Sequence, residues 1–328
     1  MSEQNNFYWA NLLHLGCNLW TEPGNSRGMA ERSIPHAFTE LQFDRALWDK
    51  HILELKEAGC NMLVMDVCEA LRYESHPELA VKGSWTHDEM RKEVERLRQM
   101  GFEVVPKLNF SSCHDIWLKD YSRMLSTPIY YQVCRDVIDE VCQVFHPQYF
   151  HLGMDEEAYD LQRHYDYVVI RQHDLWWKDF YYLAECVERH NARPWVWSDF
   201  MWDHPAEFLE KMPKDVVQSN WYYSGAFENL DAWHTTSLQS FDLLEENGYD
   251  QIPAGSLWED FANLQGLTRY CAEHISGGHH LGMMQTTWER IANPYMPLHS
   301  AAASTIARAK QWLEERTKKR LYCKQRKT

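Results

Sequence analysis

Short apolar runs alternate with longer amphipathic stretches along the whole chain. A bounded apolar run of five to eight residues is typical of a buried strand, whereas apolar positions every three to four residues are typical of a helix. The pattern predicts strands over residues 12–19, 61–67, 103–110, 149–153, 194–198, 216–221, 251–256 and 281–288. It predicts helices over residues 44–58, 86–100, 130–144, 175–190, 205–212, 241–247, 264–276 and 297–315.

Several predicted helices carry recognisable end signals. Thr86 is placed to cap the second helix, and Glu89 three residues later completes a capping box. Gly59, Gly101 and Gly248 follow the ends of three predicted helices, where a glycine commonly stops the helix. The helix boundaries therefore agree with the periodicity.

The regular order of strand and helix decides the fold class. Strands that alternate with helices form a parallel sheet with helices outside it, and eight such units fit a closed (β/α)8 barrel. We therefore predict an α/β TIM barrel that forms one domain over residues 1–328. The alternative is a doubly wound open sheet, but no Gly-x-Gly-x-x-Gly follows the first strand, which argues against dinucleotide binding.

Polar residues end nearly every predicted strand. In a (β/α)8 barrel the catalytic groups lie at the carboxyl ends of the strands, so these side chains are expected to meet at one mouth. They are Asn18, Asp66, Asn109, Asp155, Asp199, Asn220 and Glu289.

Net charge and composition limit which partners the protein is expected to bind. A formal net charge of −15 opposes nucleic-acid binding. The amino terminus lacks a signal-peptide pattern and no apolar run is long enough to span a bilayer, so a cytoplasmic protein without membrane contact is expected. The nine cysteines include no Cys-x-x-Cys pair, which favours free thiols and no metal site. No cofactor is expected, and the oligomeric state is open, a homo-oligomer included.

Fifteen tryptophans are an unusual number for 328 residues. They predict either an aromatic core or a pocket walled with indoles, which stack on the apolar faces of sugar rings. The tryptophans near predicted strand ends are Trp195, Trp197, Trp221, Trp258 and Trp288.

The fourth predicted strand ends in the adjacent carboxylates Asp155 and Glu156. Burying such charge beside a strand is costly unless it is used or neutralised. Paired carboxyl groups are what the hydrolysis of a glycosidic bond requires. The purely structural alternative is that the two residues cap the following helix. We take Asp155 and Glu156 as the candidate reaction centre.

The surrounding motifs resemble a known family. Residues 151–156, His-Leu-Gly-Met-Asp-Glu, resemble the His-x-Gly-Gly-x-Asp-Glu region of family-20 glycoside hydrolases, the β-N-acetylhexosaminidases. Residues 104–109, Val-Val-Pro-Lys-Leu-Asn, with His114 resemble the third-strand Ile-Pro-Glu-Ile-Asp motif and its nearby histidine. Asp66 with residues 71–74, and the Trp288-Glu289 pair, resemble further motifs in the same order. The lone-barrel, hexosaminidase D-like branch is the nearest likeness.

This resemblance implies an exo-acting, retaining β-N-acetylhexosaminidase that removes terminal GlcNAc or GalNAc from a small carbohydrate substrate. Glu156 would be the acid and base, and Asp155 would orient the 2-acetamido group of the sugar. The family's first-strand arginine has no counterpart near His14 or Asn18. The substrate-binding residues that the resemblance and the strand ends suggest are Asp66, Arg72, Asn109, His114, His151, Trp197, Asp199, Trp221, Tyr223, Trp258, Trp288 and Glu289.

Other functions and roles stay open at this point. Another barrel glycosidase would use Glu156 as acid and Glu289 as nucleophile, and a third possibility is a non-catalytic sugar-binding barrel. A metal-dependent hydrolase would be built on His14, His114 and His151. Locally, Asp66 could pair with Arg72, Glu289 with Arg290, and Asp199 could cap a helix; Tyr222, Tyr223 or Trp258 could hold the acetamido group.

Overall fold

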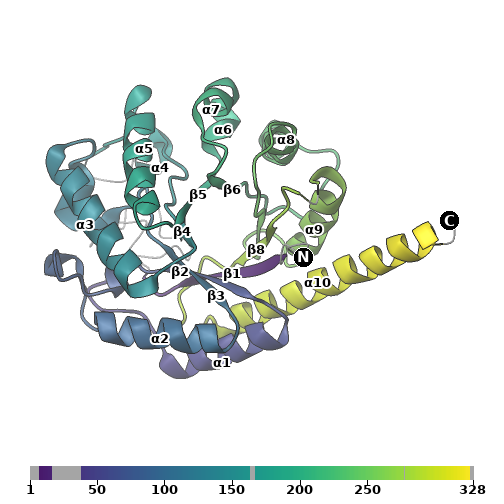
Figure 1. Ribbon diagram of the computed structural model, residues 1–328, viewed down its shortest axis with the longest axis horizontal. Coiled ribbons are helices and arrows are strands. Elements are labelled where there is room, and N and C mark those ends of the chain that lie inside the picture. Colours follow the sequence, from purple (N-terminus) through teal and green to yellow (C-terminus); the bar gives the residue numbers. More distant parts are fainter. Residues whose placement is uncertain (1–6, 17–37, 163–166, 277, 326–328) are drawn as a thin grey trace.

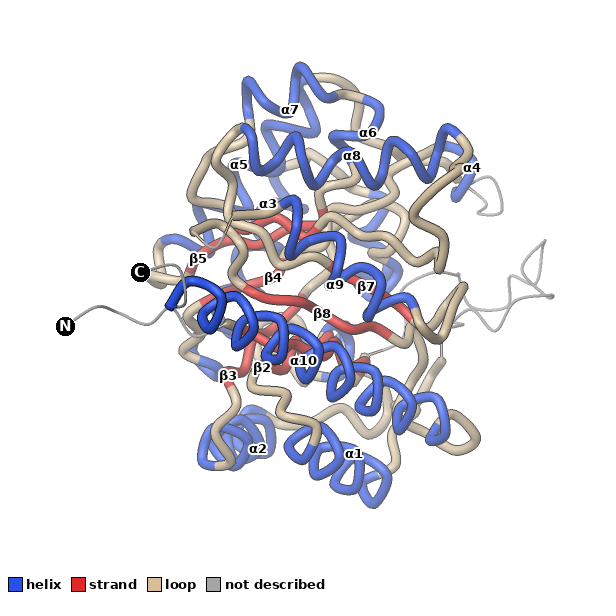
Figure 2. The backbone as a smooth tube through the Cα atoms, turned by 90° about the vertical axis from the view of Figure 1, so that its right-hand side faces the viewer, coloured by secondary structure: helices blue, strands red, loops and turns tan. Residues whose placement is uncertain are grey.

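The computed structural model describes residues 7–16, 38–162, 167–276 and 278–325 (Figure 1). Eight parallel strands form its centre and helices surround them (Figure 2). The strands are β1 (Tyr8–His14), β2 (Met62–Asp66), β3 (Glu103–Lys107), β4 (Tyr149–His151), β5 (Arg193–Trp197), β6 (Val217–Ser219), β7 (Ala254–Ser256) and β8 (Gly282–Thr286).

The sheet closes on itself. Its strand order is β6-β5-β4-β3-β2-β1-β8-β7, and parallel bridges from Gln218 to Gln251 and from Trp221 to Ala254 join the two outer strands. The predicted (β/α)8 barrel is therefore confirmed. The doubly wound open sheet is excluded, because its outer strands would not pair with each other.

The helices follow the strands in the expected alternation. They are α1 (Arg45–Glu57), α2 (His87–Gln99), α3 (Pro128–Phe145), α4 (Tyr159–Gln162), α5 (Asp174–Glu188), α6 (Phe200–Asp203), α7 (Pro205–Lys211), α8 (Ala232–Glu246), α9 (Asn263–His274) and α10 (Met296–Gln325). Short 3₁₀ helices span Cys68–Ala70, Pro77–Leu79 and Ile116–Arg123. The capping box of Thr86 and Glu89 at the start of α2 is present as predicted.

Several predicted boundaries were wrong, among them the end of the last helix, which runs to Gln325 instead of residue 315. The first strand begins at Tyr8 instead of residue 12, and residues 17–19 of the prediction, with Asn18, lie outside the described residues. Helix α8 begins at Ala232 instead of residue 241, because the side chain of Asp231 caps it by accepting from the His234 N–H. Its first turn carries few apolar residues, so hydrophobic periodicity gave no signal there.

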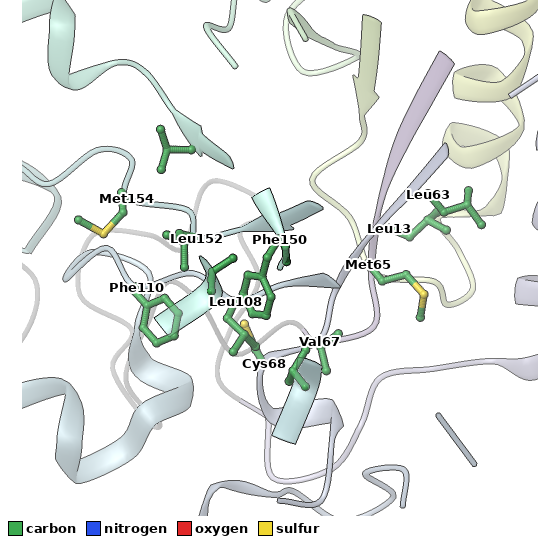
Figure 3. Packing of buried hydrophobic residues seen from close by; sticks show 14 of the residues in the cluster. Leu13, Leu63, Met65, Val67, Cys68, Leu108, Phe110, Phe150, Leu152 and Met154 are labelled. Atoms are coloured by element: carbon green, nitrogen blue, oxygen red, sulfur yellow. The ribbon is translucent and has the colours of Figure 1, made fainter. Parts of the chain in front are cut away.

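Alternate residues of each strand build two separate apolar layers. Leu12, Val64 and Val105 point into the barrel, whereas Leu13 and Leu63 pack against the helices. Figure 3 shows part of the outer layer, with Leu13 and Leu63 among the labelled side chains. Strands buried on both sides read as continuous apolar runs, which is why the sequence pattern located them.

Two smaller findings bear on the sequence analysis. The seven cysteines whose side chains the structure describes are buried and free, as predicted. Among the described residues, no helix has both the length and the apolar composition needed to cross a membrane.

Candidate active site

The turn that follows β4 presents Asp155 at the mouth of the barrel. Its Oδ1 atom accepts a hydrogen bond of 2.8 Å from the Asn109 side-chain amide, which follows β3. Gly153 and Met154 both have positive φ, 73° and 71°. A Cβ on Gly153 would lie 2.1 Å from Asn109 Oδ1, so a glycine is required for this close approach.

The backbone of Glu156 is held by a hydrogen bond, and its side chain is partly exposed. Its φ of 55° lies in the left-handed region, a strained conformation for glutamate that clusters at functional sites. Its N–H donates to Asp199 Oδ2 at 2.8 Å, and its side chain is 38% exposed. The alternative that the pair caps the following helix is therefore wrong, because the Asp155 side chain contacts Asn109 and the Glu156 side chain contacts His114.

Asp199 supports the turn and does not cap a helix. It precedes α6, but its side chain makes no capping hydrogen bond. Its Oδ1 atom accepts from the Trp221 indole N–H at 3.3 Å. Burial and the negative charges of Asp155 and Glu156 raise the pKa of Asp199 to about 7.

His114 links the two candidate catalytic carboxylates. Its Nε2 atom lies 3.1 Å from Glu156 Oε2 and 3.5 Å from Asp155 Oδ2. Burial alone would favour a neutral ring, but Asp155 and Glu156 together raise the pKa of His114. A protonated His114 can therefore donate to a carboxylate of the pair.

Glu157 belongs to a separate structural network. Arg171 Nη1 contacts its Oε2 at 2.9 Å, and Arg171 Nε contacts Asp179 Oδ2 at 2.7 Å, all three side chains being buried. The charge of Glu157 is thus largely neutralised within the wall of the barrel. Burial opposes the charged guanidinium, but Glu157, Tyr130 and Asp179 hold the pKa of Arg171 above its usual range. Arg171 gave no signal in the sequence, because it lies in a loop without a motif.

Aromatic rings wall the pocket beside the carboxylates. The Trp197 and Trp288 ring centroids are 5.7 Å apart, and Tyr223 stacks on Trp221 at 4.9 Å. Tyr223 also lies 6.4 Å from Trp288, so these four rings are contiguous. Trp258, from the loop after β7, is 37% exposed and stands at the outside. The predicted cluster of aromatic rings near the strand ends is therefore present, with each of the four contiguous side chains 8% exposed or less.

A buried polar layer lies under the pocket. Lys107 Nζ contacts Asp66 Oδ2 at 2.6 Å, and His14 Nδ1 lies 3.5 Å from the same oxygen. Burial raises the pKa of Asp66, but Lys107 and His14 lower it more. The pKa of Asp66 therefore lies below its usual value. The sequence analysis quoted Lys107 within a motif but assigned it no role. The signal that the sequence offered for such a role was a lysine at the end of an apolar strand.

Arg72 does not pair with Asp66. Its side chain is exposed and donates to the Ser84 carbonyl at 3.5 Å. The loop after β2 turns outward before Arg72, whereas the partner of Asp66 comes from β3. The suggested pairing of Arg72 with Asp66 is therefore wrong, whereas the substrate contact of Arg72 stays a prediction.

The predicted site residues His151 and Glu289 are both buried. His151 is fully buried between Trp195 and Trp197, and its Nδ1 atom accepts from the Gly153 N–H at 3.0 Å. Burial and the charge of Lys107 lower the pKa of His151, so it is neutral and supports the turn. Glu289 is buried directly after β8, next to Trp288 of the pocket wall.

Within the part of the chain that the structure describes, one group of side chains could hold a metal ion. His114, Asp155 and Glu156 offer ligand atoms within 4.8 Å of one another. The predicted alternative of three histidines is wrong, because His14 contacts Asp66 and His151 contacts the Gly153 backbone. This group contains the carboxylate pair of Asp155 and Glu156. Both carboxylates contact the His114 ring.

A parallel eight-stranded barrel with a carboxylate pair at its mouth, and an indole stacked on a phenol beside the pair, is an arrangement that suits a carbohydrate-active barrel enzyme. The family model for the catalytic domain of glycosyl hydrolase family 20 matches residues 111–289, more than half of the chain. The chain therefore belongs to glycosyl hydrolase family 20. This confirms the resemblance and the class of glycoside hydrolase that the sequence motifs predicted.

Solved structures of several family members share the fold. The β-N-acetylhexosaminidase from Bacteroides fragilis has a TM-score of 0.63 at 14% identity, covering 98% of this chain and 71% of its own. The chitobiase from Flavobacterium johnsoniae has a TM-score of 0.60 at 18% identity, covering 80% and 46%. The exo β-N-acetylglucosaminidase from Vibrio harveyi, solved in complex with N-acetylglucosamine, has a TM-score of 0.61 at 14% identity, covering 92% and 54%.

One curated protein matches a shorter part of this chain. Lacto-N-biosidase from Bifidobacterium bifidum is 21% identical over 123 residues, which are 33% of this chain and 11% of that protein. The chain thus spans about a tenth of the lacto-N-biosidase and, by structure, about half of the chitobiase.

Proposed function

We propose that the protein is an exo-acting, retaining β-N-acetylhexosaminidase that removes terminal GlcNAc or GalNAc with help from the substrate's own acetamido group. One observation carries this proposal. Asp155 and Glu156 reach the same atom, Nε2 of His114, while Asn109 holds the other oxygen of Asp155.

The shared histidine argues against Asp155 as a direct nucleophile. In retaining enzymes that form a covalent intermediate, the acid and the nucleophile flank the anomeric carbon from opposite faces, about 5–5.5 Å apart. Asp155 and Glu156 instead approach one side of the pocket, with the His114 ring between their oxygens. Substrate assistance needs no carboxylate nucleophile, which fits this arrangement.

Each step then has a residue in place. Glu156 gives its proton to the glycosidic oxygen, and the bond from that oxygen to the anomeric carbon breaks. The acetamido carbonyl oxygen attacks the same carbon and forms a cyclic oxazolinium ion. Asp155 accepts a hydrogen bond from the acetamido N–H and stabilises the positive charge that develops there. Water then attacks the anomeric carbon, the bond from that carbon to the acetamido oxygen breaks to restore the acetamido group, and Glu156 takes a proton from that water.

Tyr223 is the residue we assign to the acetamido carbonyl oxygen. Burial and the charges of Glu156 and Asp155 hold the pKa of its phenol far above the usual value, so the hydroxyl keeps its proton and can donate. Its ring stacks on Trp221 at 4.9 Å, which fixes its direction. Trp197 and Trp288 supply the apolar faces for the sugar ring.

The filled interior of the barrel supports exo action. Asp66, Lys107 and His151 are fully buried inside the barrel. A filled barrel leaves a substrate access to the carboxylates from the mouth alone, which suits a sugar at the end of a glycan. The Vibrio harveyi relative, solved with N-acetylglucosamine, is consistent with this assignment.

The test compares nitrophenyl β-glycosides of GlcNAc, GalNAc, glucose and galactose on wild type, Glu156→Gln and Asp155→Asn. We expect turnover of the 2-acetamido sugars alone, inhibition by a thiazoline mimic of the intermediate, and a loss of at least about 100-fold in kcat/KM in either variant. Glu57→Gln, an exposed carboxylate on α1, is the matched control and keeps wild-type activity.

Two outcomes would overturn the proposal. Folded wild type that turns over neither 2-acetamido glycoside contradicts the hexosaminidase assignment and favours a sugar-binding barrel. Turnover that a chelator abolishes would instead place a metal ion at His114, Asp155 and Glu156.

A further inference from the structure

The turn that carries Glu156 is attached to the end of β5 at two points. The Trp197 N–H donates to the Gly153 carbonyl at 3.1 Å, and the Glu156 N–H donates to Asp199 Oδ2 at 2.8 Å. Gly153, Met154 and Glu156 all have positive φ. A non-glycine residue stays in such a conformation only where its surroundings hold it there. The second attachment is made by a side chain, so the backbone conformation of Glu156 depends on Asp199.

The backbone conformation of Glu156 sets the direction of its side chain. Glu156 Oε2 lies 3.1 Å from His114 Nε2, and Asp155 Oδ2 lies 3.5 Å from the same nitrogen. The side chain of Glu156 is 38% exposed, so packing restrains it only in part. A backbone that left the left-handed region would turn the Cβ and move the carboxyl away from Asp155. A displacement of about 1 Å at a catalytic group can cost about 100-fold in rate.

The two carboxylate oxygens of Asp199 accept from two different donors. Oδ2 accepts from the Glu156 N–H, and Oδ1 accepts from the Trp221 indole N–H at 3.3 Å. A carboxylate can accept both bonds at once, whereas the side-chain amide of asparagine offers one acceptor oxygen and one donor group. Asp199→Asn would therefore bring an N–H₂ group against one of the two donors. The pair of contacts requires a carboxylate at this position.

We propose that Asp199 is the positioning residue of the general acid, whose carboxylate holds the Glu156 backbone in the left-handed region and so keeps the Glu156 carboxyl where it protonates the glycosidic oxygen. This inference rests on the proposed function, because it needs Glu156 as the acid. It gives Asp199 a role that acts through Glu156 and requires no contact with the sugar.

The experiment measures kcat/KM for phenyl β-GlcNAc and for 2,4-dinitrophenyl β-GlcNAc, which share one sugar and differ in their leaving groups. Phenol needs a proton in order to leave, whereas dinitrophenolate leaves without one. In Asp199→Ala we expect a loss of about 30- to 100-fold on the phenyl glycoside and of less than about 5-fold on the dinitrophenyl glycoside. Asp203→Ala removes an exposed carboxylate from α6 and keeps wild-type values for both.

A second comparison tests the geometry of the two contacts. Asp199→Asn should lose roughly 10-fold on the phenyl glycoside, because its N–H₂ group meets a donor. Trp221→Phe removes the indole donor and keeps an aromatic ring. In the Trp221→Phe background, Asp199→Asn should cost less than about 3-fold, since the amide oxygen can then accept from the Glu156 N–H while its N–H₂ group faces no donor.

The outcomes separate this inference from the function beneath it. Equal losses on the two glycosides in Asp199→Ala, or an equal cost of Asp199→Asn in both backgrounds, overturn the positioning role and leave the hexosaminidase assignment standing. Wild type that cleaves neither glycoside overturns both. Thermal unfolding verifies that the variants are folded, and Asp199→Asn supplies the comparison of leaving groups should the alanine variant be unstable.

Discussion

The Asn109 side-chain amide donates to Asp155 Oδ1 across 2.8 Å, joining the ends of β3 and β4. The other side of Asn109 is also engaged, since its Oδ1 atom accepts from the Ser111 N–H at 3.0 Å. The amide is thereby fixed with its N–H₂ group toward Asp155. An amide does not titrate, so the Asn109 N–H₂ group can donate to Asp155 at every pH.

Asn109→Asp should therefore make catalysis newly dependent on pH. Two carboxylates this close cannot both ionise without strong repulsion, so the pKa of the pair rises. We expect kcat/KM to fall about 10- to 100-fold at pH 8 and to recover largely near pH 5, where the pair shares a proton. A pH–rate profile measures this. Asn109→Ala is the control, with a loss at every pH and no added limb; an Asn109→Asp profile parallel to wild type would contradict the prediction.

Gly153→Ala should destabilise the protein through its contact with Asn109. The new Cβ would lie 2.1 Å from Asn109 Oδ1 and 2.8 Å from Asn109 Cα, at a φ of +73°. We expect a loss of more than roughly 3 kcal/mol in the free energy of unfolding by urea. Gly83→Ala is the matched control: its φ is +87°, but the nearest atom is 3.6 Å away, so about 1–2 kcal/mol is expected. Equal losses in the two variants would show that the contact with Asn109 is unimportant.

Arg171→Met should unfold the protein more easily without acting on chemistry. It would leave Glu157 and Asp179 buried without their cation, which typically costs about 3–5 kcal/mol. Urea unfolding and kcat on the same samples check both statements. Arg189→Met breaks an exposed pair with Glu185 on α5 and should change stability little. Wild-type stability in Arg171→Met would mean that the buried network is not structural.

Asp115 should make stability fall as the pH rises. Neither of its carboxyl oxygens accepts a hydrogen bond from any group that the structure describes, and burial raises its pKa to about 8. The unfolded chain has an ordinary aspartate pKa near 3.9, so only the folded state holds this proton between about pH 4 and pH 8. The stabilisation is complete below pH 4 and is lost as the pH rises toward 8.

Asp115→Asn removes this titration and should flatten the pH dependence. The difference in unfolding free energy between pH 5 and pH 8 should shrink by on the order of 2 kcal/mol relative to wild type. Asp199, with its pKa of about 7, titrates in the same direction and leaves a residual slope. Urea titrations at both pH values test this, and identical slopes for the two proteins would refute the role of Asp115.

The sequence by itself determined the barrel and indicated the candidate reaction centre. Each strand is buried on both sides, so its apolar run is visible without a neighbour, and the capping box of Thr86 and Glu89 is local by nature. The carboxylates of Asp155 and Glu156 were identifiable because they end such a run.

Only the tertiary structure decided which partners these groups meet. Asn109 and Asp155 are 46 residues apart, and their contact follows from the register of β3 against β4. Lys107 reaches Asp66 for the same reason, whereas Arg72, much nearer in sequence, is carried away by its loop. Periodicity reports which face of an element is buried, but the side chains that share a site are set by strand register and loop direction, which depend on the whole folded chain.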